Sequence, residues 1–430
     1  MHRLVWGSGV GTVDMNHRKT VAIVVPDLTG GGGVPAVARF LCKAIEQSNY
    51  FNARLFSLPS SVADPASLRL VAPRTWPRGP VVEKGEWEKR EFEHVGAVFA
   101  EFEFQRYRPR RVLTSLLREC DLVQVVAGNP AWALVASRAG RPVTLQVATL
   151  ASVERQERFR QERGPLALWR RAMTRVTRQL ERRAVQVADR IFVENRWMEK
   201  TLSAWTQPGR VVLAAPGVDT EVFRPPHAGV DRPPQGVYIL SVARWEDRRK
   251  NLRLLLEAYA RLKREMSSEV PRLVLAGETG PLRKDWALAR DLGISNSVSF
   301  HKRPSRKELA NLYRHAAVFV LPSSEEGLGL VLLEAMASGT PVVSTATEGA
   351  QQALEDGVTG VLTPIGDPGA LAAAMNTLLG NPGRRRELGE RGRERAIRHF
   401  SQRTAAERFL AVYRELIGTE SRTLKLERAG

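Results

Sequence analysis

Apolar runs of strand length alternate with helical patterns along this chain. The run from Thr20 to Val25 consists of β-branched and apolar residues and stops at Pro26, a pattern typical of a buried parallel strand. A glycine-rich segment comes next, and apolar residues then recur at helical spacing from Val34 to Ile45. This part of the chain therefore predicts a strand, a glycine loop and a helix in that order.

The same pattern starts again in the second half of the chain. Val237 to Val242 predicts a strand, Ala243 to Lys250 a polar loop, and Leu252 to Arg264 a helix with Asn251 as its N-terminal cap. Four further strands are predicted at Arg272–Ala276, Val298–Phe300, Val318–Leu321 and Pro341–Ser344. Such alternation indicates an α/β protein whose parallel sheets are covered by helices on both faces.

A segment rich in proline and glycine, Arg224 to Gly236, separates the two halves and stops both helix and strand. The length of 430 residues also exceeds the roughly 250 residues that one hydrophobic core supports. We therefore predict a first domain at 18–225 and a second domain at 235–402.

The segment after the strand at Val318–Leu321 carries the most specific chemistry. Gly327 and Gly329 precede a short helix. Leu328 lies between them, and Leu330 follows Gly329 at the start of the helix. Without side chains, these glycines let free backbone N–H groups and the positive end of the helix approach an anion closely. This loop is predicted to bind a diphosphate.

Two glutamates belong to this segment. Glu326 lies in the loop beside the predicted phosphates, whereas Glu334 lies inside the helix and could accept hydrogen bonds from vicinal hydroxyls such as those of ribose. Either glutamate taken alone is more often a solvated surface residue. The apolar runs Leu330–Leu333 and Ala335–Ala337 leave Glu334 little solvated face, and a carboxylate in such surroundings needs a partner.

The stretch from Glu326 to Pro341 resembles the donor signature of the retaining family 4 glycosyltransferases, E-G-hydrophobic-G…E-A-hydrophobic-A-small-G-x-P. The resemblance extends from about Val21 to about Glu415. It implies a GT-B fold, in which two Rossmann-like, doubly wound parallel-sheet domains face a central cleft and a C-terminal helix, here at about 403–420, crosses back to the first domain. It also implies donor binding by the second domain and acceptor binding by the first.

The resemblance assigns roles to residues outside the signature. Arg244 and Lys250 match the arginine and lysine that clamp the donor diphosphate, and with Glu326 they form the predicted catalytic set. Paired cations of this kind neutralise the charge that develops on a departing diphosphate. Because that clamp and the helix N-terminus take the role of a cation, we expect no metal and no cofactor. Arg248 and Arg249 are expected to be solvated.

On the acceptor side, Gly31, Gly32 and Gly33 match a glycine-rich loop that faces the donor across the cleft. Many family members carry a histidine at the position of Gln146, close to the transferred sugar. An amide can bond a sugar hydroxyl but does not titrate near neutral pH. No catalytic base is therefore predicted at this position.

The net charge of +19 recruits phosphates, nucleic acid or anionic lipid. A basic amphipathic segment at 166–187 fits an anionic membrane surface, or a surface helix whose apolar stripe packs on the core. Its apolar residues are Leu166, Trp169, Met173, Val176, Leu180 and Val187, with arginines between them. The basic cluster around Arg106–Arg111 carries no nucleic-acid fold motif, so nucleic acid is not an expected partner.

The expected function is transfer of a sugar from a nucleotide-diphosphate sugar to a hydroxyl in envelope glycolipid or polysaccharide synthesis, with a soluble small-molecule acceptor as the alternative. Two cysteines and no spanning or signal segment indicate a cytoplasmic protein, free or peripheral at the inner face of the membrane. A dinucleotide oxidoreductase would need G-x-G-x-x-G and a later acidic residue, which neither half shows. A non-catalytic basic scaffold is the third possibility.

Overall fold

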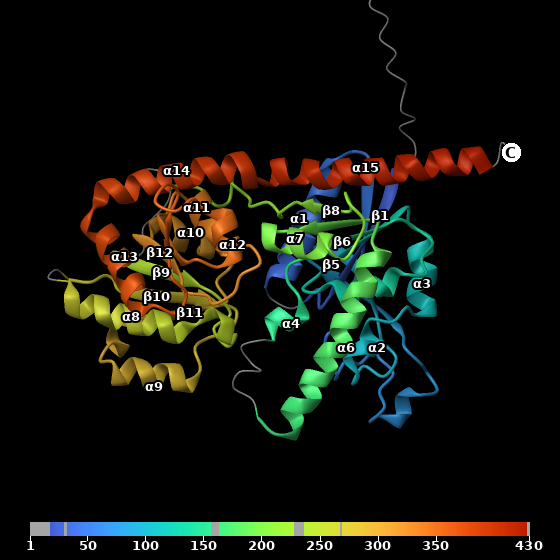
Figure 1. The fold of residues 1–430 in the computed structure, drawn as a ribbon, viewed down its shortest axis with the longest axis horizontal. Coiled ribbons are helices and arrows are strands. Elements are labelled where there is room, and N and C mark those ends of the chain that lie inside the picture. Colours follow the sequence, from blue (N-terminus) through green and yellow to red (C-terminus); the bar gives the residue numbers. More distant parts are fainter. Residues whose placement is uncertain (1–17, 30–31, 156–162, 228–235, 267–268, 428–430) are drawn as a thin grey trace, which may run out of the picture.

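The computed structural model describes residues 18–29, 32–155, 163–227, 236–266 and 269–427. Two sheets, one in each half of the chain, lie side by side beneath a long C-terminal helix (Figure 1). This arrangement is the two-domain α/β fold that the sequence predicts.

The first sheet has eight strands in the order β3-β4-β2-β1-β5-β6-β7-β8. Only β3 runs antiparallel to its neighbour; it forms an edge that the parallel prediction did not include. The strands are β1 (Lys19–Pro26), β2 (Phe51–Leu58), β3 (Val82–Trp87), β4 (Arg90–Val95), β5 (Leu122–Ala127), β6 (Val143–Val147), β7 (Arg190–Val193) and β8 (Val211–Leu213). β1 and β5 are buried on both faces, as expected of central parallel strands.

Helices cover both faces of this sheet. α1 (Gly33–Gln47) packs on one face together with the C-terminal helix, and α6 (Pro165–Val187) packs near the other face against a 3₁₀ helix at Pro130–Ala136. The smaller helices are α2 (Glu103–Arg106), α3 (Arg111–Arg118), α4 (Ala151–Glu154) and α7 (Arg196–Ser203). The predicted apolar stripe of α6 is divided: Leu180 packs against the core, whereas Trp169 is exposed, as is the neighbouring Leu168.

The second sheet has six parallel strands in the order β11-β10-β9-β12-β13-β14. They are β9 (Tyr238–Val242), β10 (Arg272–Gly277), β11 (Val298–Lys302), β12 (Val318–Leu321), β13 (Val342–Thr345) and β14 (Val361–Thr363). The helices are α8 (Leu252–Glu265), α9 (Arg283–Asp291), α10 (Arg306–His315), α11 (Leu330–Ala337), α12 (Glu348–Ala353), α13 (Pro368–Gly380) and α14 (Pro382–Phe400). Asn251 precedes α8 with a left-handed φ of 48°, but its side chain makes no capping hydrogen bond.

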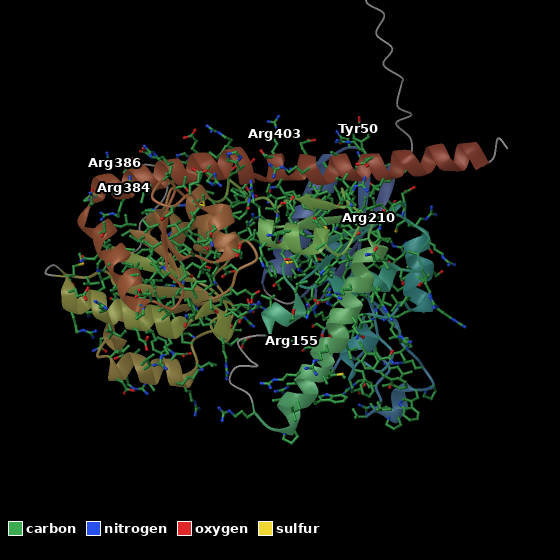
Figure 2. All side chains as sticks on the ribbon, in the orientation of Figure 1. Tyr50, Arg155, Arg210, Arg384, Arg386 and Arg403 are labelled. Carbon is green, nitrogen blue, oxygen red and sulfur yellow. The ribbon has the colours of Figure 1, made fainter. Side chains whose placement is uncertain are left out.

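The last helix, α15 (Gln402–Glu427), leaves the second domain and lies on the first. The predicted crossing helix is therefore confirmed. The ring centroid of Phe409 lies 4.3 Å from that of Phe192 in β7 and 5.6 Å from that of Phe40 in α1. The Tyr413 hydroxyl donates to Gln124 Oε1 of β5 at 2.8 Å. Arg386 and Arg403, in contrast, project outward from α14 and α15 (Figure 2).

Within the described part of the chain, no helix combines the length and the apolar character that crossing a membrane requires.

The replacement Phe409→Ala is expected to destabilise the fold by about 3–5 kcal/mol, because it removes a fully buried ring between two other rings. Urea unfolding of the whole chain measures this loss. Arg408→Ala, at an exposed position on the same helix, is the control and is expected to change stability by less than about 0.5 kcal/mol. Equal stability of the Phe409→Ala variant and the wild type would mean that α15 is not anchored at this point.

Candidate active site

The predicted donor loop lies at the carboxyl edge of the second sheet, between β12 and α11. Gly329 occupies the N-cap position of α11 with φ 77°, and a Cβ placed there would lie 2.9 Å from Leu332 Cδ1. Only glycine fits both constraints. Leu328 is buried in the core, so the loop can offer a ligand the backbone of Leu328 but not its side chain. The helix N-terminus thus presents backbone N–H groups, as anion binding requires.

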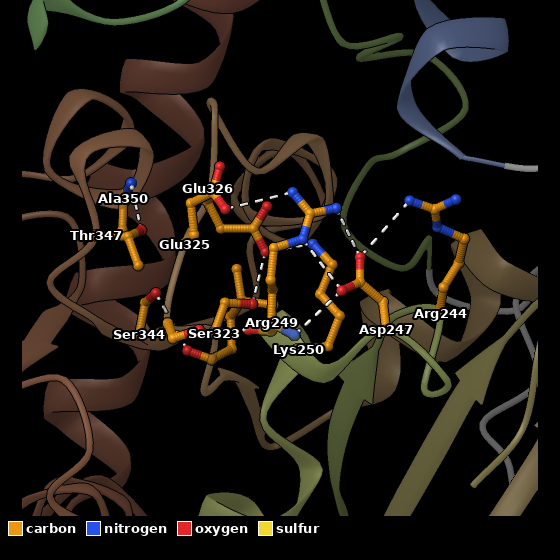
Figure 3. A network of polar contacts seen from close by, with 12 residues as sticks. Arg244, Asp247, Arg249, Lys250, Ser323, Glu325, Glu326, Ser344, Thr347 and Ala350 are labelled. Atoms are coloured by element: carbon orange, nitrogen blue, oxygen red, sulfur yellow. Dashed lines mark hydrogen bonds and ion pairs between the residues drawn. The ribbon is translucent and has the colours of Figure 1, made fainter. Parts of the chain in front are cut away.

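An ion pair connects this loop to the loop after β9. Lys250 Nζ lies 2.7 Å from Glu326 Oε1, and the Ser323 hydroxyl donates to the same oxygen at 2.6 Å (Figure 3). Both charged side chains are largely buried, with 18% and 9% of their surface exposed. Two of the three predicted catalytic residues are therefore in direct contact.

Arg249 was expected to be a solvated member of a basic loop, and that expectation was wrong. Its side chain is only 18% exposed and lies 2.8 Å from Asp247 and 3.4 Å from Glu325 (Figure 3). Burial favours the neutral form of Asp247, but the Arg249 guanidinium outweighs it and lowers the pKa of that carboxyl. Arg249 also reaches Glu154 of the first domain at 3.4 Å, so it spans the interface between the domains.

Arg244 of the second domain lies next to Gly32 of the glycine-rich segment. A Cβ on Gly32 would lie 3.4 Å from Arg244 Cζ, and Gly32, with φ 114°, is the N-cap of α1. Gly33 begins α1, whereas Gly31 lies outside the described residues. Arg244 is 44% exposed and lies 3.8 Å from Asp247, so its guanidinium remains accessible to solvent.

Glu334 lies on α11, away from the ion pair. Its Oε2 accepts a hydrogen bond of 2.9 Å from the hydroxyl of the buried Tyr313. Burial raises the pKa of Glu334 to about 7, although the bond from Tyr313 and the charge of Arg306 act in the other direction. The role of Glu334 toward ribose stays a prediction.

The first domain contributes a wall that the sequence did not reveal. Gln146 is 1% exposed and donates to Glu194 Oε1 at 3.1 Å, so it lies beneath the surface of the cleft rather than at it. The Asn195 side chain donates to the carbonyl of Gly327 at 2.6 Å, and a Cβ on Gly327 would lie 3.0 Å from Glu194 Oε2. The turn after β7 therefore holds the donor loop from the other domain.

Glu194 is an unusual carboxyl group within this wall. It is 6% exposed, and burial raises its pKa to about 7; the negative charge of Glu326 acts in the same direction and the bond from Gln146 against it. A lone glutamate at the end of a strand gives no signal in the sequence. Asn195 could have been recognised as the N-cap of α7, since its side chain accepts from Met198 N at 2.8 Å.

A cavity of about 390 Å³ opens between the two domains at this point. The second domain lines it with Glu325, Glu326 and Gly327, and the first domain with Thr149 and Asn195. Thr347 and Glu348, at the start of α12, also line it. Its size suits a ligand of the class of small metabolites and cofactors.

The second domain is similar in sequence to known glycosyl transferases. Residues 227–395 match the family model of the glycosyl transferases group 1. A D-inositol 3-phosphate glycosyltransferase 1 of Catenulispora acidiphila is 36% identical over 55% of this chain and 60% of its own length. One from Frankia alni is 42% identical over 41% of this chain and 46% of its own length. The matched region thus spans only about half the length of these relatives.

Solved structures match nearly the whole chain. Sucrose-phosphate synthase of Thermosynechococcus elongatus superposes with a TM-score of 0.71 at 22% identity, covering 94% of this chain and all of that one. Anabaena HepE in complex with UDP and glucose gives 0.67 at 15% identity, covering 93% of this chain and all of that one. Two Rossmann-like domains facing a cleft, with the crossing C-terminal helix, define the GT-B fold. Within this fold, residues 227–395 of the second domain are the part that is similar to the group 1 glycosyl transferases.

Replacement of Glu194 by glutamine is expected to change how stability depends on pH. Because the pKa of Glu194 is raised to about 7 in the folded protein, its contribution to stability is present at low pH and is lost as pH rises toward 7. The variant should therefore gain stability relative to the wild type between about pH 4.5 and pH 7, by up to about 1.4 kcal/mol per pH unit.

Urea unfolding of both proteins across this pH range measures the difference. Glu181 and Glu334 also have pKa values raised to about 7, but they are present in both proteins and their effects cancel. Glu390→Gln, at an exposed position on α14, is the matched control. Parallel stability curves for wild type and Glu194→Gln would show that Glu194 does not titrate in this range.

Proposed function

We propose that the protein is a retaining glycosyltransferase that moves a sugar from a nucleotide-diphosphate sugar to a hydroxyl of a small soluble acceptor. The observation that carries this proposal is the Lys250–Glu326 ion pair at the N-terminus of α11, with Arg244 facing the glycine loop nearby. A helix N-terminus flanked by two cations is suited to a diphosphate. The family match of residues 227–395 and the UDP bound by HepE support a nucleotide-diphosphate sugar as the donor.

In the proposed reaction, the bond between the anomeric carbon and the diphosphate oxygen breaks while the acceptor oxygen bonds to the same carbon. The acceptor attacks on the face from which the diphosphate departs, and its proton passes to the departing phosphate oxygen. Arg244, Lys250 and the amides of α11 stabilise the charge that develops on the leaving group. Glu326 holds Lys250 in place before the donor enters. Glu334 accepts hydrogen bonds from the vicinal hydroxyls of the ribose.

The names of the relatives favour a soluble acceptor over an envelope glycolipid. Both matched relatives from Catenulispora acidiphila and Frankia alni are named as glycosyltransferases of D-inositol 3-phosphate, a small polar molecule. The acceptor side of this chain is formed by its first domain, which lies outside the segment that matches the family model. The acceptor must therefore be inferred from the first domain itself.

The variants Lys250→Ala and Glu326→Ala are expected to lower kcat/KM for sugar transfer by about 100-fold or more. The first removes one cation of the donor clamp, and the second removes the carboxylate that holds this cation in place. Lys250→Ala should also abolish the thermal stabilisation of the protein by nucleoside diphosphates. The screen uses UDP, GDP and ADP at saturating concentration, where binding stabilises by about 2.7 kcal/mol at 100 times the dissociation constant.

Lys307→Ala, on the exposed side of α10, is the matched lysine control and should behave as the wild type. Undiminished transfer or donor hydrolysis by the two cleft variants would contradict the roles assigned to them. Absence of stabilisation by all three diphosphates would contradict the donor site as a whole.

A peripheral contact with an anionic membrane surface at the inner face of the cytoplasmic membrane is a second proposal, and the first half of α6 favours it. This part of the helix extends away from the sheet (Figure 1). Leu168 and Trp169 are 66% and 54% exposed there, and the arginines Arg175 and Arg178 are exposed further along. Exposed apolar residues followed by cations form the pattern of helices that lie in a lipid interface.

The double variant Leu168→Ala/Trp169→Ala is expected to reduce sedimentation with phosphatidylglycerol-containing vesicles by about tenfold, because two interfacial side chains are lost. Ile397→Ala, which removes a side chain 43% exposed on α14, is the control. Equal sedimentation of all three proteins, or none with the wild type, would contradict a membrane contact through α6.

A further inference from the structure

A second cavity, of about 370 Å³, lies entirely within the first domain. It opens at the edge of the sheet where the parallel strands β1, β2 and β4 end and where the antiparallel strand β3 begins. Ligands of open α/β sheets bind outside the carboxyl ends of the strands. The cavity therefore occupies a place suited to a ligand, and the donor site does not include it.

The wall of this cavity contains a fixed polar network. His94 Nε2 lies 2.8 Å from Asp64 Oδ1, and His94 Nδ1 lies 3.1 Å from the Ser57 hydroxyl. Asp64 also accepts from the Ser67 hydroxyl. Burial raises the pKa of Asp64, but the bonds from His94 and Ser67 outweigh it, so that its pKa is lowered. These contacts hold the imidazole at one orientation at the cavity wall.

An aromatic side chain lies beside this network. Phe92 of β4 lines the cavity, and a Cβ on the facing Gly85 of β3 would lie 2.6 Å from Phe92 Cζ. The absence of a side chain at Gly85 lets the ring lie against the neighbouring strand. An apolar ring next to hydroxyl, imidazole and carboxylate groups matches a sugar or cyclitol, which has apolar C–H faces and a rim of hydroxyls.

The exposed charged side chains that line the cavity are two carboxylates and one lysine, a balance that disfavours an anionic ligand. Among the described residues that line it, Lys84 is the only one with a fixed positive charge, whereas Asp27 and Glu83 are exposed carboxylates. Asp27 has a left-handed backbone with φ 54°, which is uncommon outside glycine and is often found at functional sites. A phosphate would meet both carboxylates. An uncharged hydroxyl can instead donate hydrogen bonds to them.

The length of the chain between Thr29 and Gly32 limits how far the cavity lies from the second domain. Thr29 lines the cavity, and Gly32, three residues later, faces Arg244 of the second domain. Three residues of extended chain span at most about 11 Å. The cavity therefore has one wall residue within about 11 Å of Gly32, where the two domains face each other.

We propose that the cavity formed by Asp27, Asp64, Glu83, Phe92 and His94 binds the acceptor, and that this acceptor is an uncharged polyhydroxylated ring without a phosphate. The proposal rests on the proposed glycosyltransferase function and adds the chemical class of its acceptor. The proposed acceptor therefore differs from the phosphorylated compound, D-inositol 3-phosphate, that appears in the names of the relatives.

The test is equilibrium binding of myo-inositol and myo-inositol 3-phosphate to the full chain, by calorimetry and without nucleotide-sugar. We expect wild type to bind the unphosphorylated ring at least tenfold more tightly. His94→Gln should weaken that binding at least tenfold. The double variant Asp27→Asn/Glu83→Gln should reduce the ratio of the two affinities, because it removes both carboxylates that oppose the phosphate of myo-inositol 3-phosphate. Asparagine is chosen at position 27 because it tolerates the left-handed backbone there. Asp291→Asn, exposed on α9, is the matched control.

Tighter binding of the 3-phosphate, binding of neither ring, or full myo-inositol binding by His94→Gln would each overturn the inference. UDP, GDP and ADP stabilisation is measured on the same proteins and is expected to be equal in all of them. Stabilisation by a diphosphate without myo-inositol binding contradicts the acceptor inference alone. Myo-inositol binding without stabilisation by any diphosphate contradicts the proposed donor function alone.

Discussion

The ion pair between Lys250 and Glu326 is the interaction on which the cleft depends. Strands β9 and β12 are neighbours in the second sheet, so the loops that follow them meet although 76 residues separate the two side chains. A buried charge without a partner is strongly unfavourable, and each residue removes this cost for the other. A diphosphate entering at α11 would offer Lys250 a second anionic partner. The pair therefore stabilises both buried charges and holds the cation of Lys250 at the position where a leaving group would need it.

The first domain holds the loop that carries this pair. Asn195 donates to the carbonyl of Gly327, and Thr149 donates to Glu325 at 2.8 Å. On the far side of the interface, Asp219 accepts from Lys43 of α1 and from Arg306 of α10, at 2.9 and 3.2 Å. Interfaces built from a few polar contacts allow domains to move relative to each other. Asn195 and Thr149 contact residues on either side of Glu326, so a movement of the first domain relative to the second would also shift this loop.

Local patterns in the sequence predicted the parts of the structure that local physics determines. The strands β1, β9 and β12 follow from short apolar runs, and Gly329 follows from the backbone that begins α11. Arg249 was misjudged because its burial depends on Glu154 and Glu325, which are distant in the sequence. Glu194 was missed for the same reason: its environment comes from Gln146 and from a loop of the other domain.

The charges of the protein act over two different distances. The net charge of +19 attracts anions such as nucleotide-sugars from solution. Salt screens such attraction beyond about 8–10 Å, so it cannot discriminate between ligands within a cavity. Discrimination must come from nearby groups, and these differ between the two sites: Arg244 and Lys250 at the donor loop, but Asp27 and Glu83 at the cavity of the first domain. A basic protein can thus carry two cations at one loop and two exposed carboxylates at the wall of another cavity.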